Sequence, residues 1–324
     1  MKKIIGLSVI LAVVMLLAPI SALDLPPKVP TVTTVEGAEK QPESEKAVAE
    51  YFKVYSPETQ KITEMTADDY IFGVVAAEMP ALYNEEALKA QAVAAYTYAC
   101  VRKANNSGQD YDITTDYNVD QSFVTESDLK EKWGDKTQEY VAKIKKAVKD
   151  VRGYMITYDG KAITAVYHAI SSGKTENAEN VWSKGLPYLK SVESSGDKEA
   201  ENYKTEVTLT LEELKEKLKP EFEIKKGDDI VFEILEVTDA GTVKKLKIAG
   251  FECSGAALRN LLDLRSACFS VEKTDTGYTF TVYGYGHGVG MSQTGANYMA
   301  ERGSDFKEIL THYYTGCKVE KVIK

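Results

Sequence analysis

Two helical segments separated by one proline constrain the fold more than any other part of the chain. Thr66 begins a capping-box-like pattern, and Ile71, Val74 and Val75 follow it at helical spacing. Pro80 cannot continue a helix, because its ring fixes φ and it has no N–H to donate. We therefore expect a helix that ends just before Pro80. A second, mostly apolar helix is expected to start near Asn84 and to be buried.

Glu78 lies on the apolar stripe of the first helix. It follows Ile71 by seven residues and Val74 by four, so the helix would direct its carboxylate along the apolar face. Apolar neighbours and the negative end of the helix dipole both disfavour the ionised form, so we expect a raised pKa, which suits a general acid. The alternative is a helix-terminal Glu that bends out to water, since charged side chains are seldom fully buried.

The composition limits the class of protein. The 324 residues, 44% of them apolar, can bury a substantial core in one large domain or two lobes. A formal net charge of −9 argues against nucleic acid as a partner, because phosphate binding needs a basic surface. Four scattered Cys indicate neither a zinc ribbon nor a dense disulfide framework, and a single bridge between Cys253 and Cys268 is left open.

The N-terminal residues 1–23 are predicted to be a membrane anchor. Lys2 and Lys3 precede an uncharged apolar run at residues 4–23, which is long enough to cross a bilayer. By the positive-inside rule the N-terminus is cytoplasmic and the remainder lies outside. A cleaved signal peptide, with its small-residue site at Ser21-Ala22, is the alternative. Residues 24–50 are rich in Pro, Thr, Glu and Lys, which predicts a flexible stalk.

Residues 51–324 are expected to form a two-lobed α+β domain of mixed helices and antiparallel strands, with a β-rich lobe at about 190–280. Asp159-Gly160 is a strong hairpin turn, so strands are expected on both sides of it, at 154–157 and 162–167. Alternation or helical spacing predicts the other elements: strands at 51–54, 230–251, 269–271 and 278–282, a strand and helix at 207–218, and helices at 258–264 and 306–314.

Two polar stretches are candidate sites. His168 follows a predicted strand, and Ser171, Ser172 and Gly173 come directly after it; such a group is either a binding site or an ordinary loop. In residues 284–290 the glycines alternate, which matches neither the dinucleotide fingerprint nor a phosphate loop, so nucleotide binding is not expected. Alternating Gly instead lets the backbone approach another surface closely, and His287 is presented from this segment before a helix near Ser292.

Four motifs occur in order along the chain. They are EMPALYNEEALKAQAVAAYTYA at 78–99, YHAISSGKTENAENVW at 167–182, LRSACF at 264–269 and GYGHGVGMSQTGA at 284–296. Together they resemble the stage II sporulation protein D family, whose domain also occurs in amidase-enhancer proteins, over about residues 51–324.

The resemblance implies a lytic transglycosylase of peptidoglycan, a lyase held in the cell membrane by one span with its domain on the extracytoplasmic side. It would act during engulfment in sporulation, on glycan strands stripped of stem peptides, alongside the sporulation proteins P, an amidase, and M. The catalytic acid/base of the family's E-M-P motif falls on Glu78. The cleft is expected to be lined by polar groups of Tyr167, His168, Ser171, Ser172, Gly173, His287 and Gln293.

One acid is enough for this chemistry, because the substrate supplies its own nucleophile and closes a 1,6-anhydro ring. No cofactor is expected. Some family members hold a zinc with a His and Cys near the strand-end His, but here no Cys occurs between Cys100 and Cys253, so that zinc is not expected. The chain also departs from the family at Tyr96, where Arg is frequent, and at Asp120, where Cys is frequent, so the family's contacts at these positions are not carried over.

Two alternative functions follow from the same residues. The first is a binding module for peptidoglycan that stimulates an amidase without cutting glycan. The second is a zinc amidase in which His168, His287 and His312 would form a His₃ site with an open position.

Overall fold

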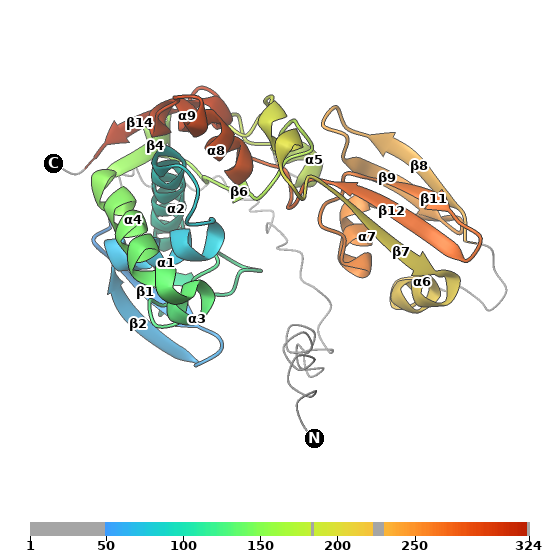
Figure 1. Cartoon of the computed structure of the whole chain (residues 1–324), viewed down its shortest axis with the longest axis horizontal. Helices are drawn as coiled ribbons and strands as arrows, with labels where there is room; N and C mark the ends of the chain where they lie inside the picture. The colour runs from blue at the N-terminus through green and yellow to red at the C-terminus, as the bar shows by residue number, and fades with distance from the viewer. Residues whose placement is uncertain (1–48, 183–184, 223–229, 323–324) are drawn as a thin grey trace, which may run out of the picture. The chain divides into compact units, whose positions relative to one another are not determined.

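A computed structural model describes residues 49–182, 185–222 and 230–322 (Figure 1). The anchor predicted at 1–23 and nearly all of the predicted stalk lie outside these residues. In the described part of the chain, no helix is both long and apolar enough to span a membrane. The predicted mixture of helices and antiparallel strands is confirmed.

The described helices are α1 (Ala67–Glu78), α2 (Glu85–Asn105), α3 (Leu129–Trp133), α4 (Thr137–Asp150), α5 (Ala178–Val181), α6 (Leu211–Leu218), α7 (Gly255–Leu262), α8 (Gln293–Glu301) and α9 (Phe306–Tyr313), with 3₁₀ turns η1 (Gly134–Lys136) and η2 (Ser195–Glu199). The described strands are β1 (Tyr51–Ser56), β2 (Lys61–Thr66), β3 (Ile113–Thr114), β4 (Tyr154–Tyr158), β5 (Lys161–Ala162), β6 (Tyr167–His168), β7 (Lys204–Thr210), β8 (Phe232–Val237), β9 (Val243–Ile248), β10 (Phe251–Cys253), β11 (Phe269–Lys273), β12 (Gly277–Tyr283), β13 (Met291–Ser292) and β14 (Lys318–Lys321).

Helix α2 is the centre of the larger hydrophobic core. It packs against α1, α4, α8 and α9, and α1, α2 and α4 lie side by side in Figure 1. Ala87, Ala90 and Ala94 on α2 are completely buried, and their small side chains let the neighbouring helices come close. The buried second helix predicted from the sequence is confirmed, and Asn84 caps it by accepting a hydrogen bond from Glu86 N.

A second hydrophobic cluster lies in the β-rich part of the chain. One antiparallel sheet has the strand order β11-β12-β7 and another the order β10-β9-β8. Their buried residues, among them Leu246 and Phe280, pack with Leu214 of α6 and Leu258 of α7. This part of the fold therefore has its own core, separate from the one around α2.

The strand predicted at 162–167 is wrong. Strand β5 pairs with β4 only as far as Ala162, and after a bond from Ile163 N to Ile156 O the chain turns at Val166, whose N–H donates to Thr164 O. The chain then joins a different partner, because β6 pairs in parallel with β13. Apolar alternation did not predict this change of pairing partner, because β6 and β13 are more than a hundred residues apart in the sequence.

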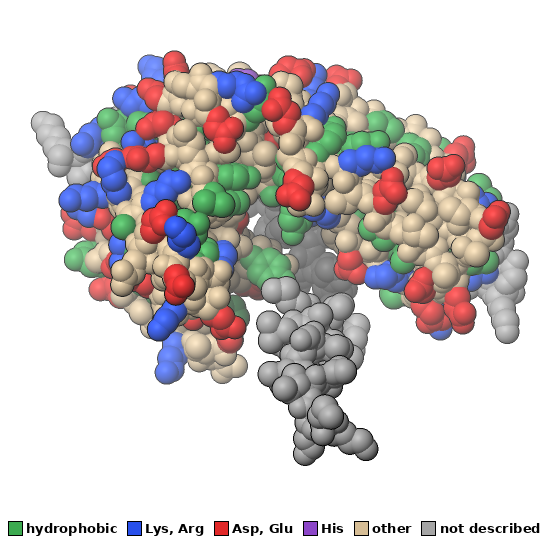
Figure 2. Space-filling view, viewed as in Figure 1, with side chains coloured by type: hydrophobic (Ala, Val, Ile, Leu, Met, Phe, Trp, Pro, Cys, Tyr) green, Lys and Arg blue, Asp and Glu red, His purple; other side chains and the backbone are tan. Residues whose placement is uncertain are grey.

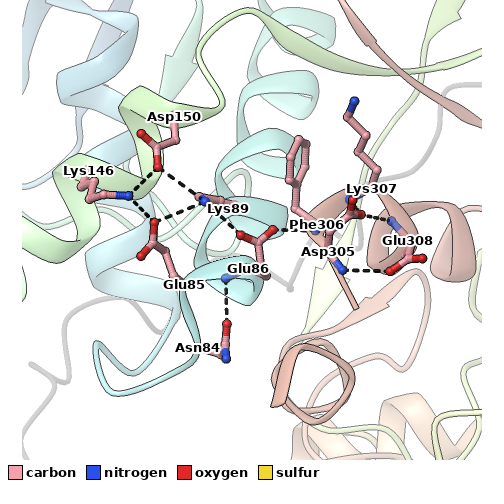
Figure 3. A network of polar contacts seen from close by, with 10 residues as sticks. All are labelled: Asn84, Glu85, Glu86, Lys89, Lys146, Asp150, Asp305, Phe306, Lys307 and Glu308. Atoms are coloured by element: carbon pink, nitrogen blue, oxygen red, sulfur yellow. Dashed lines mark hydrogen bonds and ion pairs between the residues drawn. The ribbon is translucent and has the colours of Figure 1, made fainter. Parts of the chain in front are cut away.

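A network of charged side chains ties the start of α2 to its neighbours (Figure 3). Lys89 pairs with Glu85, Glu86 and Asp150 of α4, at 3.2, 2.9 and 3.4 Å. Glu86 also accepts a hydrogen bond from the N–H of Phe306, the first residue of α9, at 2.9 Å. Single surface ion pairs contribute little to stability, but this set joins α2, α4 and α9 and so holds in place the helix that follows Pro80.

Candidate active site

Glu78 is the last residue of α1, and its carboxylate is turned toward the protein. The helix ends because Met79 takes an extended conformation before Pro80. Oε1 of Glu78 accepts a hydrogen bond from Ser122 N–H at 2.9 Å, and Oε2 lies 3.5 Å from Nε2 of Gln293. Burial raises the pKa of Glu78, although these hydrogen bonds and the charge of Lys132 act in the opposite direction. The raised pKa predicted from the sequence is confirmed.

The loop that carries Ser122 packs directly on α1. A side chain at Gly73 would come within 2.3 Å of the Phe123 ring, and Val124 N donates to Gly73 O at 3.3 Å. The Phe123 ring also stacks on Tyr70 of α1, with 5.7 Å between ring centroids. The absence of a side chain at Gly73 is therefore what lets this loop reach the carboxylate.

Three amides and a phenol are linked by hydrogen bonds near Glu78. Tyr167 Oη donates to Oε1 of Gln121 at 2.8 Å, and Nε2 of Gln293 lies 3.4 Å from Oε1 of Gln91. The charge of Glu78 also acts on Tyr167, whose pKa is raised mainly by burial. Nε2 of Gln91 is buried and has no hydrogen-bond partner among the described residues. We call Glu78, Gln91, Gln121, Tyr167 and Gln293 the acid cluster.

A short parallel strand pair brings these distant segments together. Strand β6 contributes Tyr167, strand β13 lies beside it, and Gln293 follows β13 directly. Gly290 precedes β13 with φ of +76°, and a Cβ there would lie 2.1 Å from Val166 O. The close backbone approach predicted for the alternating glycines is confirmed.

His168, His287 and Trp182 form a second group, which we call the histidine cluster. The ring centroids of His168 and His287 are 5.8 Å apart, and those of Trp182 and His287 are 5.2 Å apart. Nδ1 of His168 lies 3.1 Å from Val289 O, whereas Nδ1 of His287 accepts a bond from Val289 N at 3.1 Å. These partners assign the proton to Nδ1 in His168 and to Nε2 in His287. Nε2 of His168 is left as a buried acceptor with no partner among the described residues.

Both imidazoles are held neutral. Burial lowers the pKa of His168 to about 3 and that of His287 to about 4. The His287 ring lowers the pKa of His168 further, and the charge of Arg259 lowers that of His287. Neutral imidazoles can accept hydrogen bonds from hydroxyl and amide groups, which a protonated pair could not do.

Acidification is expected to destabilise the fold through His168. Its pKa is about 6.5 in the unfolded chain and about 3 in the folded protein. As the pH falls through this window, the unfolded chain binds a proton that the folded protein does not bind. The free energy of unfolding should then fall by up to about 1.4 kcal/mol per pH unit. Urea unfolding between about pH 7.5 and about pH 5 should give a shallower pH slope for His168→Gln, and equal slopes would contradict the assignment.

Ser171, Ser172 and Gly173 hold their own loop. Ser171 N–H and Oγ both donate to Asp197 Oδ2, the former at 2.9 Å, and Gly173 N donates to Ser171 Oγ at 3.1 Å. Ser172 Oγ donates to Ala240 O in the β-rich part. In the described structure these three residues make their hydrogen bonds here and not to the acid cluster.

Asp197 is a buried carboxylate that the sequence analysis missed. It is fully buried, and burial raises its pKa. Oδ1 accepts a hydrogen bond from Ser292 Oγ at 2.8 Å, and Ser292 is the N-cap of α8, next to Gln293. Asp197 therefore joins the loop at Ser171 to the start of α8. An acid in the polar run SGDKE gives no sequence signal for burial.

Comparison with known proteins identifies the family. A family model described as Stage II sporulation protein matches residues 55–158, which include Glu78. The chain is 35% identical to stage II sporulation protein D of Bacillus subtilis (strain 168) over 294 residues, 90% of this chain and 85% of that protein. The chain belongs to the stage II sporulation protein D family. The family member of Bacillus amyloliquefaciens is 37% identical over 271 residues, 83% of this chain and 78% of that protein.

The chain is also similar to a protein named for a different role. The amidase enhancer of Bacillus subtilis (strain 168) is 27% identical over 298 residues, which is 75% of this chain but 39% of that longer protein. The sporulation protein D family and the amidase enhancer therefore share this domain, as the sequence motifs indicated.

The side chains at the two positions that differ from the family pattern, Tyr96 and Asp120, form hydrogen bonds or ion pairs with other groups. Tyr96 Oη donates to Ala49 O at 3.0 Å and accepts from Ala49 N at 3.1 Å. The Asp120 carboxylate accepts from Thr114 N at 2.9 Å and Tyr98 Oη at 3.1 Å, and it pairs with Arg102 at 2.5 Å. Both side chains are thus engaged away from Glu78.

The His₃ site of a zinc amidase is not assembled by the described residues. His312 Nε2 lies 2.8 Å from Glu193 O, and in the described ranges no three His, Cys, Asp or Glu side chains are placed to hold a metal ion. Among the residues that the structure describes, His168 likewise has no group of His, Cys, Asp or Glu side chains around it that could hold a metal ion. All four Cys are free, so the bridge left open between Cys253 and Cys268 is not formed.

Proposed function

We propose that this family member is a lytic transglycosylase that cleaves peptide-stripped peptidoglycan between N-acetylmuramic acid and N-acetylglucosamine during engulfment. The observation that carries the proposal is Glu78, a carboxyl whose pKa burial raises, placed among amide and phenol groups. A carboxyl that stays protonated to a higher pH is suited to donate its proton to a glycosidic oxygen.

The surroundings of Glu78 favour a lyase over a hydrolase. A glycosidase uses two facing carboxyl groups, whereas a lytic transglycosylase needs one. Among the described residues, the hydrogen-bond partners of Glu78 are Ser122 and Gln293, and the charge that shifts its pKa is that of Lys132 and not of a second carboxylate. Asp120 lies two residues from Ser122, but its oxygens are occupied by Arg102, Tyr98 and Thr114.

The reaction then needs two proton transfers at the same group. Glu78 gives its proton to the glycosidic oxygen while the bond from that oxygen to C1 of the muramic residue breaks. The Glu78 carboxylate next takes the proton of the C6 hydroxyl, whose oxygen bonds to C1 and closes the 1,6-anhydro ring. Ser122 N–H and Gln293 Nε2 hold the carboxylate between the two steps.

The cellular setting is part of the proposal. The apolar run at residues 4–23 would anchor the chain in the cell membrane with this domain on the extracytoplasmic side. Its partners there would be the glycan strands and the sporulation proteins P and M.

Product analysis tests the reaction. The full chain in detergent is incubated with peptide-free glycan strands, and the products are analysed by mass. Anhydro-muramic ends, lighter by one water than hydrolysis products, are expected. Products with free reducing ends would require a hydrolase with a second carboxylate, and intact strands would exclude catalysis.

The second candidate is a non-catalytic enhancer of an amidase, favoured by the similarity to the amidase enhancer. In that case the chain would accelerate a purified amidase on intact peptidoglycan, and Glu78→Gln would accelerate it equally. Intact peptide-free strands in the product analysis, together with this stimulation, would select the enhancer over the lyase.

A further inference from the structure

A pocket lies beside the histidine cluster and does not include Glu78. It encloses about 120 Å³ and is lined by His287 together with Ser172, Glu176, Lys244 and Arg259, among others. One water needs roughly 10–15 Å³ measured in this way, so a small polar substituent fits. Because His287 belongs both to this pocket and to the histidine cluster, a strand bound along the cluster could place a side group here.

Arg259 brings to this pocket a positive charge that forms no ion pair with a described carboxylate. Its Nε donates to Leu264 O at 3.2 Å, and within the described ranges its guanidinium forms no ion pair with a carboxylate. On the face seen in Figure 2, acidic and basic side chains are interspersed. The other cation named above, Lys244, pairs with Glu236 at 2.9 Å. A partly buried cation without a counter-ion is costly, so this arrangement points to an anion supplied by a ligand.

Glu176 limits which anion fits. Its buried carboxylate accepts hydrogen bonds from Asn177 N at 2.8 Å, Asn180 Nδ2 at 2.7 Å and Thr238 Oγ1 at 2.6 Å. This fixed negative group in the same pocket would repel a phosphate dianion more strongly than a monoanion. A single carboxylate facing Arg259 therefore suits the pocket best.

We infer that Arg259 binds the lactyl carboxylate of a muramic acid residue and so selects strands without stem peptides; this rests on the proposed function. In peptide-bearing strands that carboxyl is an amide to the peptide, and it becomes a free anion only after the peptide is removed. The planar guanidinium matches a carboxylate with two parallel hydrogen bonds. An amide at the same place has no charge with which the guanidinium could pair.

Binding to two matched glycans tests this. One is peptide-free glycan, and the other is the same glycan with its carboxyls converted to methylamides. The full chain carrying Glu78→Gln, which slows turnover, should bind the methylamide glycan about 10- to 100-fold more weakly than the peptide-free glycan. Adding Arg259→Gln should remove this difference. Arg259→Lys keeps the positive charge but cannot form two parallel hydrogen bonds, so it should retain part of the difference in affinity. Arg302→Gln, at an exposed Arg stacked on Tyr298, is the control and should retain all of the difference.

The outcomes separate this inference from the proposed function. Equal binding of both glycans by the protein with Arg259 intact would overturn the carboxylate site, and this comparison does not depend on whether Arg259→Gln folds. Cleavage of the methylamide glycan as fast as the peptide-free glycan would also overturn it while leaving the lyase in place. Tighter binding of the free-carboxylate glycan, together with no cleavage by the protein that keeps Glu78, would support the site and refute the lyase.

Discussion

Glu78→Gln is expected to lower the rate of strand cleavage by about 10²- to 10⁴-fold, the range typical of a lost general acid or base. The change keeps the shape of the side chain, and the amide oxygen can still accept the bond from Ser122 N–H. It removes the proton that the glycosidic oxygen needs and the base that the C6 hydroxyl needs. Initial rates on peptide-free glycan, with products identified by mass, measure the effect.

A matched control is Glu139→Gln, the same chemical change at an exposed position of α4. It should cleave at close to the wild-type rate. Undiminished cutting by Glu78→Gln would show that the acid lies elsewhere and that the proposal is centred on the wrong residue.

The pH profile gives an independent readout of Glu78. The reaction begins from the protonated carboxyl, so the rate should fall as the pH rises through the pKa of Glu78. Because burial raises this pKa, the fall should occur at higher pH than for a free Glu side chain. Any residual activity of Glu78→Gln should not show this fall in rate as the pH rises.

The local parts of this site could be predicted from the sequence, because their causes are local. Thr66 caps α1 through Asp69 N, Pro80 follows its end, and Ser292 caps α8, all within a few residues. The spacing of Glu78 from its apolar neighbours likewise predicted the raised pKa. Its catalytic role came from the motif resemblance, since spacing alone left a solvent-exposed Glu as an alternative.

The partners of Glu78 could not be predicted in the same way. Ser122 and Gln293 lie 44 and 215 positions away, and they reach the carboxylate through a loop packed on Gly73 and through the β6–β13 pair. Such contacts depend on tertiary packing, which hydrophobic periodicity does not encode. The same limitation hid Asp197 and made residues 162–167 look like one strand.

Gly290→Ala is expected to be the most destabilising of the substitutions considered. The residue has φ of +76°, which costs an L-residue roughly 1–2 kcal/mol. The new Cβ would also lie 2.1 Å from Val166 O, and relieving such an overlap costs about 1–3 kcal/mol more. The free energy of unfolding should fall by roughly 2–5 kcal/mol in urea titrations.

Gly303→Ala separates the two causes of this loss. Gly303 also has a positive φ, of +98°, but a Cβ there would have no heavy atom within 4 Å. It should therefore show only the backbone cost of about 1–2 kcal/mol. Val166 directly precedes β6, so relief of the overlap at Gly290 must shift Tyr167 relative to Gln293, and cleavage should fall in Gly290→Ala even where the protein remains folded. Equal losses of stability in the two variants, with cleavage unchanged, would show that this close approach does not position the acid cluster.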